Sequence, residues 1–266
     1  MNVFSRELKA FRTSTIIWTI SLSVMVLMFF MLLPAFTKDV EASKKLVTSL
    51  PIALRTALDI SAQSFFTIYG FFSYLLTFIT LAGAVQAMNL GVGAVAKEYS
   101  SKTVDFLLTK PISRFKVLTS KVTAMLCLIL VTNLIFSTAA LLSAKLVSST
   151  SFDIKTFLLI SSTLLAIQLV FLFLGVMIAV IVTKIKSVVA VSLPVVFLFF
   201  IIGTLGSVLG NDNVRYFSPF KFFDLNYIIT HQAYEAKFLV IEAVLLIAML
   251  VISYVVYTRK DIRSVS

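Results

Sequence analysis

Five polar residues stand inside long apolar runs, where a side chain must find a hydrogen-bond partner or serve a function. Polar groups are costly in such surroundings, so they often mark a site. Two interpretations are open: they line a pathway, or they join one helix to the next by hydrogen bonds. The five residues are Gln86, Asn89, Asn133, Gln168 and Glu242.

Glu242 is the only ionisable residue of this set, and a carboxylate at that depth is a candidate for binding a proton. It is predicted to lie about one turn inside the start of the last apolar run. Lys237 and Lys221 are the basic residues expected near it, and either could form an ion pair with it.

The sequence lacks the residues that catalysis, a disulfide or a metal site would require. An intramembrane enzyme requires paired catalytic groups within the apolar runs, and no Asp–Asp, Ser–His or His-x-x-x-His pair occurs there. The only histidine, His231, lies outside the runs, and the only cysteine, Cys127, lies inside one. A single cysteine allows neither an intramolecular disulfide nor a zinc site built of cysteines. We therefore expect no catalytic residue and no metal site.

Phosphate binding by a P-loop is also excluded by the residue types. The nearest match to G-x-x-x-x-G-K-[ST] is GVGAVAKE at residues 91–98. Ala96 stands where the second glycine should be, and Glu98 stands where a hydroxyl should be. This chain is thus predicted to bind no ATP by that route, to need no cofactor of its own and not to be an enzyme.

The most informative polar stretch is KEYSSKTVDFLLTKPISRFKVLTSK, residues 97–121. Its apolar residues recur at helical spacing, and Lys102, Asp105, Thr109 and Lys110 fall on the opposite face. Pro111 should end this short helix, after which Ser113 can cap the next one. Two interpretations are open: an amphipathic helix resting on lipid, or an element that passes the motion of a soluble partner to the membrane helices.

The elements that must position these residues are membrane-spanning helices. Of the 266 residues 59% are hydrophobic and 13% are charged, whereas a soluble domain has about a quarter of its residues charged. Each span needs about 20 apolar residues. We predict one domain over residues 1–266 with spans at about 15–37, 66–96, 118–144, 156–183, 187–209 and 238–258. Six crossings place both termini on one side.

Two of the apolar runs differ from a simple span. The first apolar run is too long for the h-region of a signal peptide and ends without a small-x-small cleavage site, so we read an uncleaved span. The second run, Ile60–Ala96, has 37 residues without a charge and would measure about 55 Å as one helix. We expect an interfacial start near Ser61–Phe66 and then a long tilted helix.

Charge asymmetry predicts the orientation. Segments 1–12, 97–121, 184–186 and 259–266 together carry a net charge of +10, whereas the other loops carry +1. Because basic loops stay in the cytoplasm, both termini are predicted to be cytoplasmic. The net charge of +11 is then explained without nucleic acid. Outside, leucines four residues apart predict helical pieces in 38–60, and aromatic residues predict that 212–237 dips into the interface.

Several motifs together resemble one family. Glu98, Lys102-Thr103, Phe106-Leu107-Leu108, Lys110-Pro111-Ile112-Ser113-Arg114 and Lys121 are similar to the cytoplasmic motif of permease subunits of ABC-2 type exporters. Lys102 and Ser120 stand where many members have glycine. The basic segment Arg6–Arg12 resembles the family's elbow helix, and Ser218-Pro219-Phe220-Lys221-Phe222-Phe223-Asp224 resembles its outer motif. The closing Arg259-Lys260-Asp261-Ile262 is also similar.

The resemblance implies a fold and partners. The fold is an all-α integral membrane protein with six spans, an N-terminal interfacial elbow helix, a cytoplasmic coupling helix between spans 2 and 3, and an outer re-entrant or interfacial segment between spans 5 and 6. The partners are two ABC ATPase subunits that bind ATP and Mg, a second copy or a homologous permease, and membrane lipid, without nucleic acid. The bacterial plasma membrane is the implied location.

Residue roles follow the same resemblance. Coupling to the ATPase through residues 97–116 is expected of Glu98, Lys102, Thr103, Asp105, Thr109, Lys110, Pro111 and Arg114, and the outer motif comprises Ser218, Pro219, Phe220 and Asp224. The alternatives to an ATP-driven exporter are a gradient-driven secondary transporter and an intramembrane enzyme. A secondary transporter normally has more buried ionisable groups and repeated halves. Apolar spans and short outer loops favour an amphipathic or hydrophobic cargo.

Overall fold

The computed structural model describes residues 3–38, 40–57, 65–100, 113–148, 151–182 and 184–259, with the side chains of 37, 40, 42, 43, 46, 57, 97–100 and 212 left out. Within these ranges the protein is helical and contains no strand. Six helices are long and apolar enough to cross a membrane. They are α1 (Val3–Thr37), α4 (Ile68–Ser100), α6 (Arg114–Val147), α7 (Ile154–Ile181), α8 (Val188–Val208) and α10 (Ala236–Arg259).

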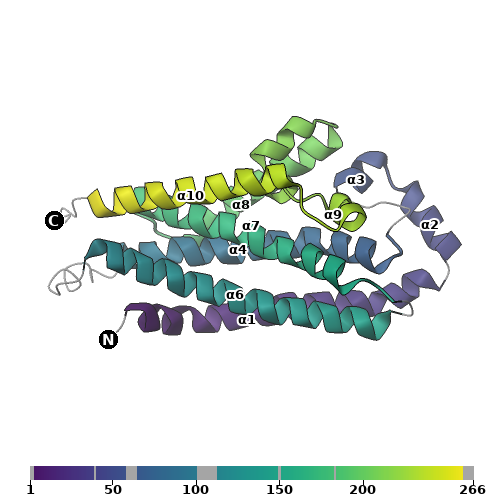
Figure 1. Ribbon diagram of the computed structural model, residues 1–266, viewed down its shortest axis with the longest axis horizontal. Coiled ribbons are helices and arrows are strands. Elements are labelled where there is room, and N and C mark those ends of the chain that lie inside the picture. Colours follow the sequence, from purple (N-terminus) through teal and green to yellow (C-terminus); the bar gives the residue numbers. More distant parts are fainter. Residues whose placement is uncertain are drawn as a thin grey trace.

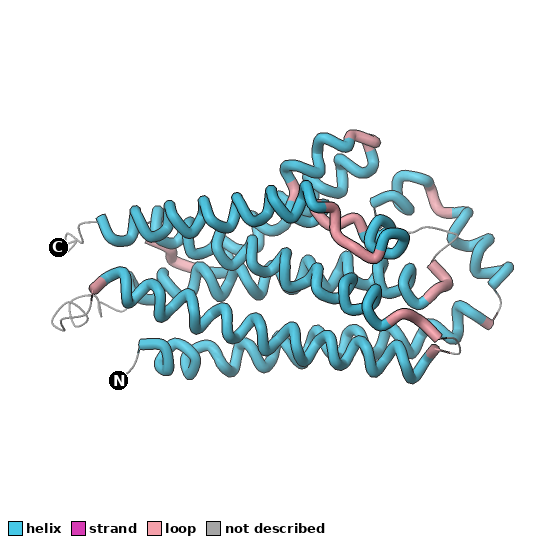
Figure 2. Tube along the Cα trace, viewed as in Figure 1, coloured by secondary structure: helices cyan, strands magenta, loops and turns pink. Residues whose placement is uncertain are grey.

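The six long helices run side by side along the long axis of the molecule (Figure 1). Both termini lie at one end, which we call the terminal end, together with the start of α6 and the link from α7 to α8. The opposite, distal end carries short helices: α2 (Val40–Ser49), α3 (Ile52–Ala57), η1 (Asp212–Phe217), η2 (Pro219–Lys221) and α9 (Leu225–His231). Figure 2 shows that the loops of the described ranges also gather mainly there.

The predicted spans are confirmed as helices, and the structure refines their ends. Segment 66–96 is a single helix from Ile68, as expected for the long second run. Residues 6–12, predicted as an elbow, form the first turns of α1 without a break before the span. Their placement at a membrane interface stays a prediction, as does that of the helices found in 38–60 and 212–237.

Short polar side chains begin three of the spans. The Ser113 hydroxyl accepts from the Lys116 amide, as predicted, at the start of α6. Asp153 caps α7 by accepting from the amides of Lys155 and Thr156, and Ser187 caps α8. Each cap satisfies an amide that has no partner within its helix.

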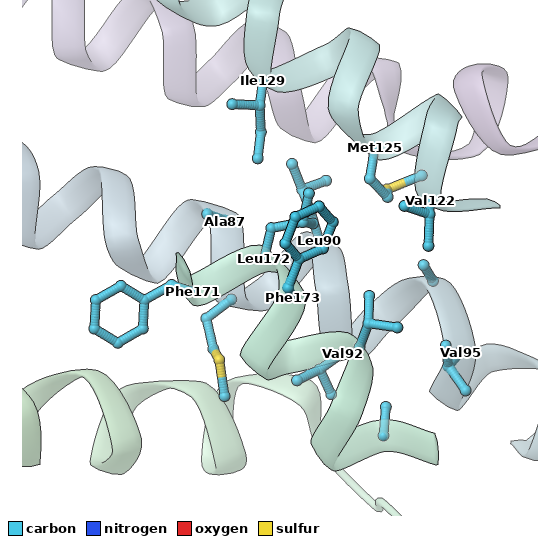
Figure 3. Packing of buried hydrophobic residues seen from close by; sticks show 14 of the residues in the cluster. Ala87, Leu90, Val92, Val95, Val122, Met125, Ile129, Phe171, Leu172 and Phe173 are labelled. Carbon is cyan, nitrogen blue, oxygen red and sulfur yellow. The ribbon is translucent and has the colours of Figure 1, made fainter. Parts of the chain in front are cut away.

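The centre of the bundle is the crossing of α4 and α7. Gly91 and Gly175 face the partner helix so closely that a Cβ on Gly91 would overlap the Leu172 carbonyl oxygen. Leu90, Val92 and Phe173 belong to the apolar cluster around this crossing (Figure 3). In α4 and in α7, 61% of the most apolar 18-residue stretch is buried inside the bundle, whereas in α8 and in α10 the share is 17%. Helices α4 and α7 therefore form the core of the bundle, and α8 and α10 lie at its surface.

Candidate functional site

A hydrogen-bonded cluster connects four helices at the centre of the bundle. The Gln168 amide of α7 donates to Gln86 Oε1 of α4 at 3.1 Å and to the Gly83 carbonyl at 3.3 Å. Gln168 in turn accepts from Asn133 of α6 at 2.6 Å. Gln86 donates to Thr132 of α6 at 3.2 Å, and Thr132 bonds to Thr19 of α1 at 2.9 Å. The side chains of this cluster are all buried.

Three of the five polar residues singled out from the sequence therefore lie together, and two do not. Gln86, Asn133 and Gln168 bond to one another across helices, which is the second of the two interpretations. Asn89 is half-buried, and its Oδ1 has no hydrogen-bond partner in the described part of the chain. Glu242 is buried in α10 and forms no ion pair with any described residue. Pathway lining by these residues stays a prediction.

A buried ion pair joins three helices near the terminal end. Lys121 of α6 is 1% exposed, and its ammonium lies 2.8 Å from Glu7 Oε1 of α1, whose side chain is 7% exposed. The same ammonium donates to the Ala94 carbonyl of α4 at 2.7 Å. Two charge-assisted hydrogen bonds thus connect the start of α1, the last turns of α4 and the second turn of α6. We call this group the terminal ion pair.

The contacts of the terminal ion pair lie on both sides of residues 97–116, the segment predicted to couple to the ATPase. Ala94 lies on the helix before that segment, and Lys121 lies on the helix after it. The Lys121 ammonium therefore connects the two helices that flank the segment. Arg114, at the first position of α6, is half-buried and has an interaction within the chain. The other predicted coupling residues lie outside the described residues or, for Glu98, have a side chain that is not described. They are Glu98, Lys102, Thr103, Asp105, Thr109, Lys110 and Pro111.

A cavity of about 300 Å³ opens in the distal part of the bundle. Its walls come from the first turns of α4, the last turns of α8 and two residues of α7, and η1, η2, the start of α9 and Thr56 of α3 complete it. Hydroxyl side chains line it from three of the long helices, and three charged residues line it from the segment that follows α8. The hydroxyl residues of the long helices are Ser73, Thr77, Thr80, Thr163, Thr204 and Ser207, and the charged residues are Arg215, Lys221 and Asp224.

The predicted outer motif builds one wall of this cavity. Ser218 is fully buried and donates to the Phe199 carbonyl at 2.8 Å, and Pro219 starts η2. The Phe220 ring lies 5.2 Å from that of Phe171, so it fixes η2 against α7. The Asp224 carboxylate caps α9. Phe220 and Asp224 line the cavity, whereas Ser218 and Pro219 hold the wall in place.

Glycines of α8 allow that wall to approach. A Cβ on Gly203 would meet Ser218 Oγ at 2.6 Å, and one on Gly206 would overlap the side chain of Val214. Gly210 has a φ of +65°, a conformation that glycine adopts at little cost. The G-x-x-x-G at 206–210 therefore serves the chain's own turn and the packing of η1.

A second ion pair lies beside the cavity. Arg215 of η1 pairs with Glu235, with side chains 26% and 21% exposed. The Arg215 Nε donates to the Lys221 carbonyl at 3.1 Å, and the guanidinium lies 4.3 Å from the centre of the Phe238 ring. We call Arg215 and Glu235 the distal ion pair. It ties η1 to η2 and to the start of α10.

The structure also reveals partners that the sequence pattern did not predict. Neither ion pair was expected, because the members of each are 114 and 20 residues apart in the chain. Tyr234, just before α10, donates to the Leu159 carbonyl at 2.7 Å, and burial raises the pKa of its phenol. Lys237, expected near Glu242, instead lies over the rings of Tyr216 and Phe238.

The fold and these features define an α-helical, multi-pass membrane protein with a polar centre and a cavity at one end. The family model described as "ABC-2 family transporter protein" matches residues 1–262. The chain therefore belongs to the ABC-2 transporter family, as its motifs predicted. A comparison with curated proteins gives no match.

Proposed function

We propose that this chain is the transmembrane subunit of an ATP-driven exporter and forms half of its translocation pathway. Family membership over residues 1–262 is the observation that carries the proposal. The sequence supports it by lacking a P-loop, so that ATP and Mg would be bound and hydrolysed by a separate ATPase chain. Two such ATPases and a second permease, identical or homologous, complete the assembly.

In this proposal the terminal end is cytoplasmic and the distal end faces outward. The charge asymmetry of the loops supports this orientation in a bacterial plasma membrane. The end of α4 and the start of α6, which flank residues 101–112, are then cytoplasmic. The distal cavity lies on the side toward which cargo is released.

The terminal ion pair supports coupling through residues 97–116. A segment can pass on motion only if its two ends are attached to helices that move with it. The Lys121 ammonium belongs to α6, the helix after the segment. It donates to α4, the helix before the segment, at 2.7 Å and to α1 at 2.8 Å. A displacement of the segment would therefore be delivered to three spans together.

Charge reversal within the coupling segment tests the proposal. Lys102→Glu and Lys110→Glu are expected to reduce ATP hydrolysis by the co-purified ATPase at least fivefold, while membrane insertion stays unchanged. Lys44→Glu is the matched control, because Lys44 is an exposed lysine of α2 at the other end. Unchanged hydrolysis in both segment variants, or transport that continues without ATP, would contradict the proposal and favour a gradient-driven transporter.

A further inference from the structure

The distal cavity combines features that point to a ligand. Its 300 Å³ lie at the lower bound of small-molecule sites. Ser73 of α4 lines it, is 6% exposed, and its hydroxyl oxygen has no hydrogen-bond partner among the residues described. A buried hydroxyl without a partner is rare and costs about 1–3 kcal/mol. A bound molecule that bonds to this hydroxyl would remove that cost.

The hydroxyl groups around Ser73 determine which hydrogen-bond partner the cavity accepts. Thr80 donates its hydroxyl proton to the Leu76 carbonyl, Thr163 donates to Ile160, and Ser207 donates to Gly203. A hydroxyl oxygen keeps two acceptor lone pairs after it has donated its proton. Thr80, Thr163 and Ser207 therefore offer acceptors to the cavity, whereas the unpartnered Ser73 hydroxyl can also donate. A head group that carries O–H or N–H donors beside acceptors satisfies both kinds of hydroxyl.

The charged residues of the cavity already have partners within the chain. Arg215 pairs with Glu235 and stacks on Phe238. The Asp224 carboxylate accepts from the amides of Asn226 and Tyr227, and Lys221 has an interaction of its own. An ionic head group would compete with these contacts, so the cavity favours an uncharged one.

Aromatic side chains supply an apolar part of the same cavity. Phe200 of α8 and Phe220 of η2 both line it, with ring centres 5.4 Å apart at 90°. Phe223 adds a third ring. Rings beside hydroxyl groups suit a molecule that has an apolar body and a polar head.

We propose that the distal cavity binds an amphipathic molecule whose uncharged head group carries O–H or N–H donors, with the head at the hydroxyls of Ser73, Thr77 and Thr80 and the apolar part against Phe200 and Phe220. The proposal names a chemical class of cargo for the exporter. The assignment of the bound molecule as cargo rests on the proposed export function. Binding itself requires neither ATP nor the partner chains.

Tryptophan fluorescence tests the site in the intact chain. Trp18, the only tryptophan, is replaced by phenylalanine, and Phe200→Trp places a reporter in the cavity wall. Phe197→Trp is the control, because Phe197 lies on the same helix, is 43% exposed and does not line the cavity. Both proteins in phosphatidylcholine nanodiscs are titrated with two dodecyl detergents below their micellar concentrations. Dodecyl maltoside has an uncharged, donor-rich head, and dodecylphosphocholine has a zwitterionic head without donors.

The expected result is a saturable spectral change of the Phe200→Trp reporter with the maltoside and at least tenfold weaker binding of the phosphocholine. Thr77→Val should weaken maltoside binding about three- to tenfold, the effect of one hydrogen bond. Thr138→Val, the same change at an exposed position of α6 outside the cavity, should not. Ser73→Ala should weaken binding without lowering the unfolding temperature, because the hydroxyl has no partner to lose.

Three results would overturn the proposal: no saturable change in the Phe200→Trp protein, equal binding of both detergents, or the same response in the Phe197→Trp control. Since the ATPase is absent from the assay, these results leave the coupling proposal intact. Conversely, normal binding together with unaltered hydrolysis in the coupling variants would overturn only the proposed function.

Discussion

Each end of the bundle has an ion pair that joins separate helices, and the two pairs differ in burial. Lys121 and Glu7 at the terminal end are 1% and 7% exposed. Arg215 and Glu235 at the distal end are 26% and 21% exposed. The buried pair joins three membrane-spanning helices, whereas the partly exposed one joins short helices to the start of α10.

The difference in burial determines how costly it is to separate the charges of each pair. Burying two charges costs several kcal/mol per ion, and only close contacts compensate for it. Such a pair tolerates no separation, so the helices it joins must move together. The distal pair is partly exposed, so separating its charges should cost less. We therefore expect the helices at the terminal end to be held together more strongly than the short helices at the distal end.

The largest expected effect is at the terminal ion pair. Lys121→Met leaves the buried Glu7 carboxylate with only the 3.6 Å contact to the partly exposed Arg6 and should lower the free energy of unfolding by about 3–5 kcal/mol. The double variant Glu7→Leu with Lys121→Met removes both charges and should recover most of this loss. Thermal unfolding in nanodiscs measures both. If the double variant unfolds as early as the single one, packing of the lysine chain rather than charge pairing explains the effect.

A smaller loss is expected at the central cluster. Gln168→Leu removes hydrogen bonds to Gln86, Asn133 and the Gly83 carbonyl. Interhelical bonds of this kind contribute about 0.6 kcal/mol each, so the loss should be about 2 kcal/mol. If these bonds serve only to connect helices, ATP hydrolysis by the assembled transporter should change less than stability. A loss of hydrolysis with unchanged stability would instead support pathway lining.

At the distal ion pair the expected effect is smaller still. Glu235→Gln should cost about 0.5 kcal/mol, since exposed pairs contribute at most about 1 kcal/mol. Glu7→Gln is the matched change at the buried pair and should cost several times more. Raising the salt concentration to about 0.5 M should weaken only the distal pair. Equal losses in the two glutamine variants would contradict the contrast between the ends.

The smallest effect concerns Asp153, the exposed cap of α7. Hydrogen bonds from the hydroxyl and the amide of Thr156 hold the pKa of this carboxyl below its ordinary value of 3.8. The stabilisation is therefore complete above pH 3.8 and declines as the pH falls through the lower folded-state pKa. The stability difference between wild type and Asp153→Ala should be constant from about pH 5 to 8 and shrink in acid. A difference that grows in acid would reverse the sign of this linkage.

Much of the fold could be predicted because hydrophobicity is a local property. Charge-free runs of about 20 residues identify spans without knowledge of their neighbours. Ser113 and Asp153 were predictable as caps for the same reason, since a cap bonds to amides two or three residues away. The cytoplasmic and outer motifs were sufficient to predict the family.

The candidate sites were less predictable because their contacts join distant parts of the chain. Gln86, Asn133 and Gln168 were identified as special, but whether they bond to one another depends on how α4, α6 and α7 rotate about their axes. Lys121 was part of a recognised motif, yet nothing near it in the sequence indicates that it pairs with Glu7.

By itself, the sequence determined six spans, the position of the polar residues within them, the missing P-loop and the family. Only the tertiary structure decided that Lys121 is a buried junction of α1, α4 and α6, and that hydroxyls of α4, α7 and α8 face one cavity. The physical reason is that transfer into a membrane is governed by each segment's own composition, whereas a site depends on which faces of separate helices meet.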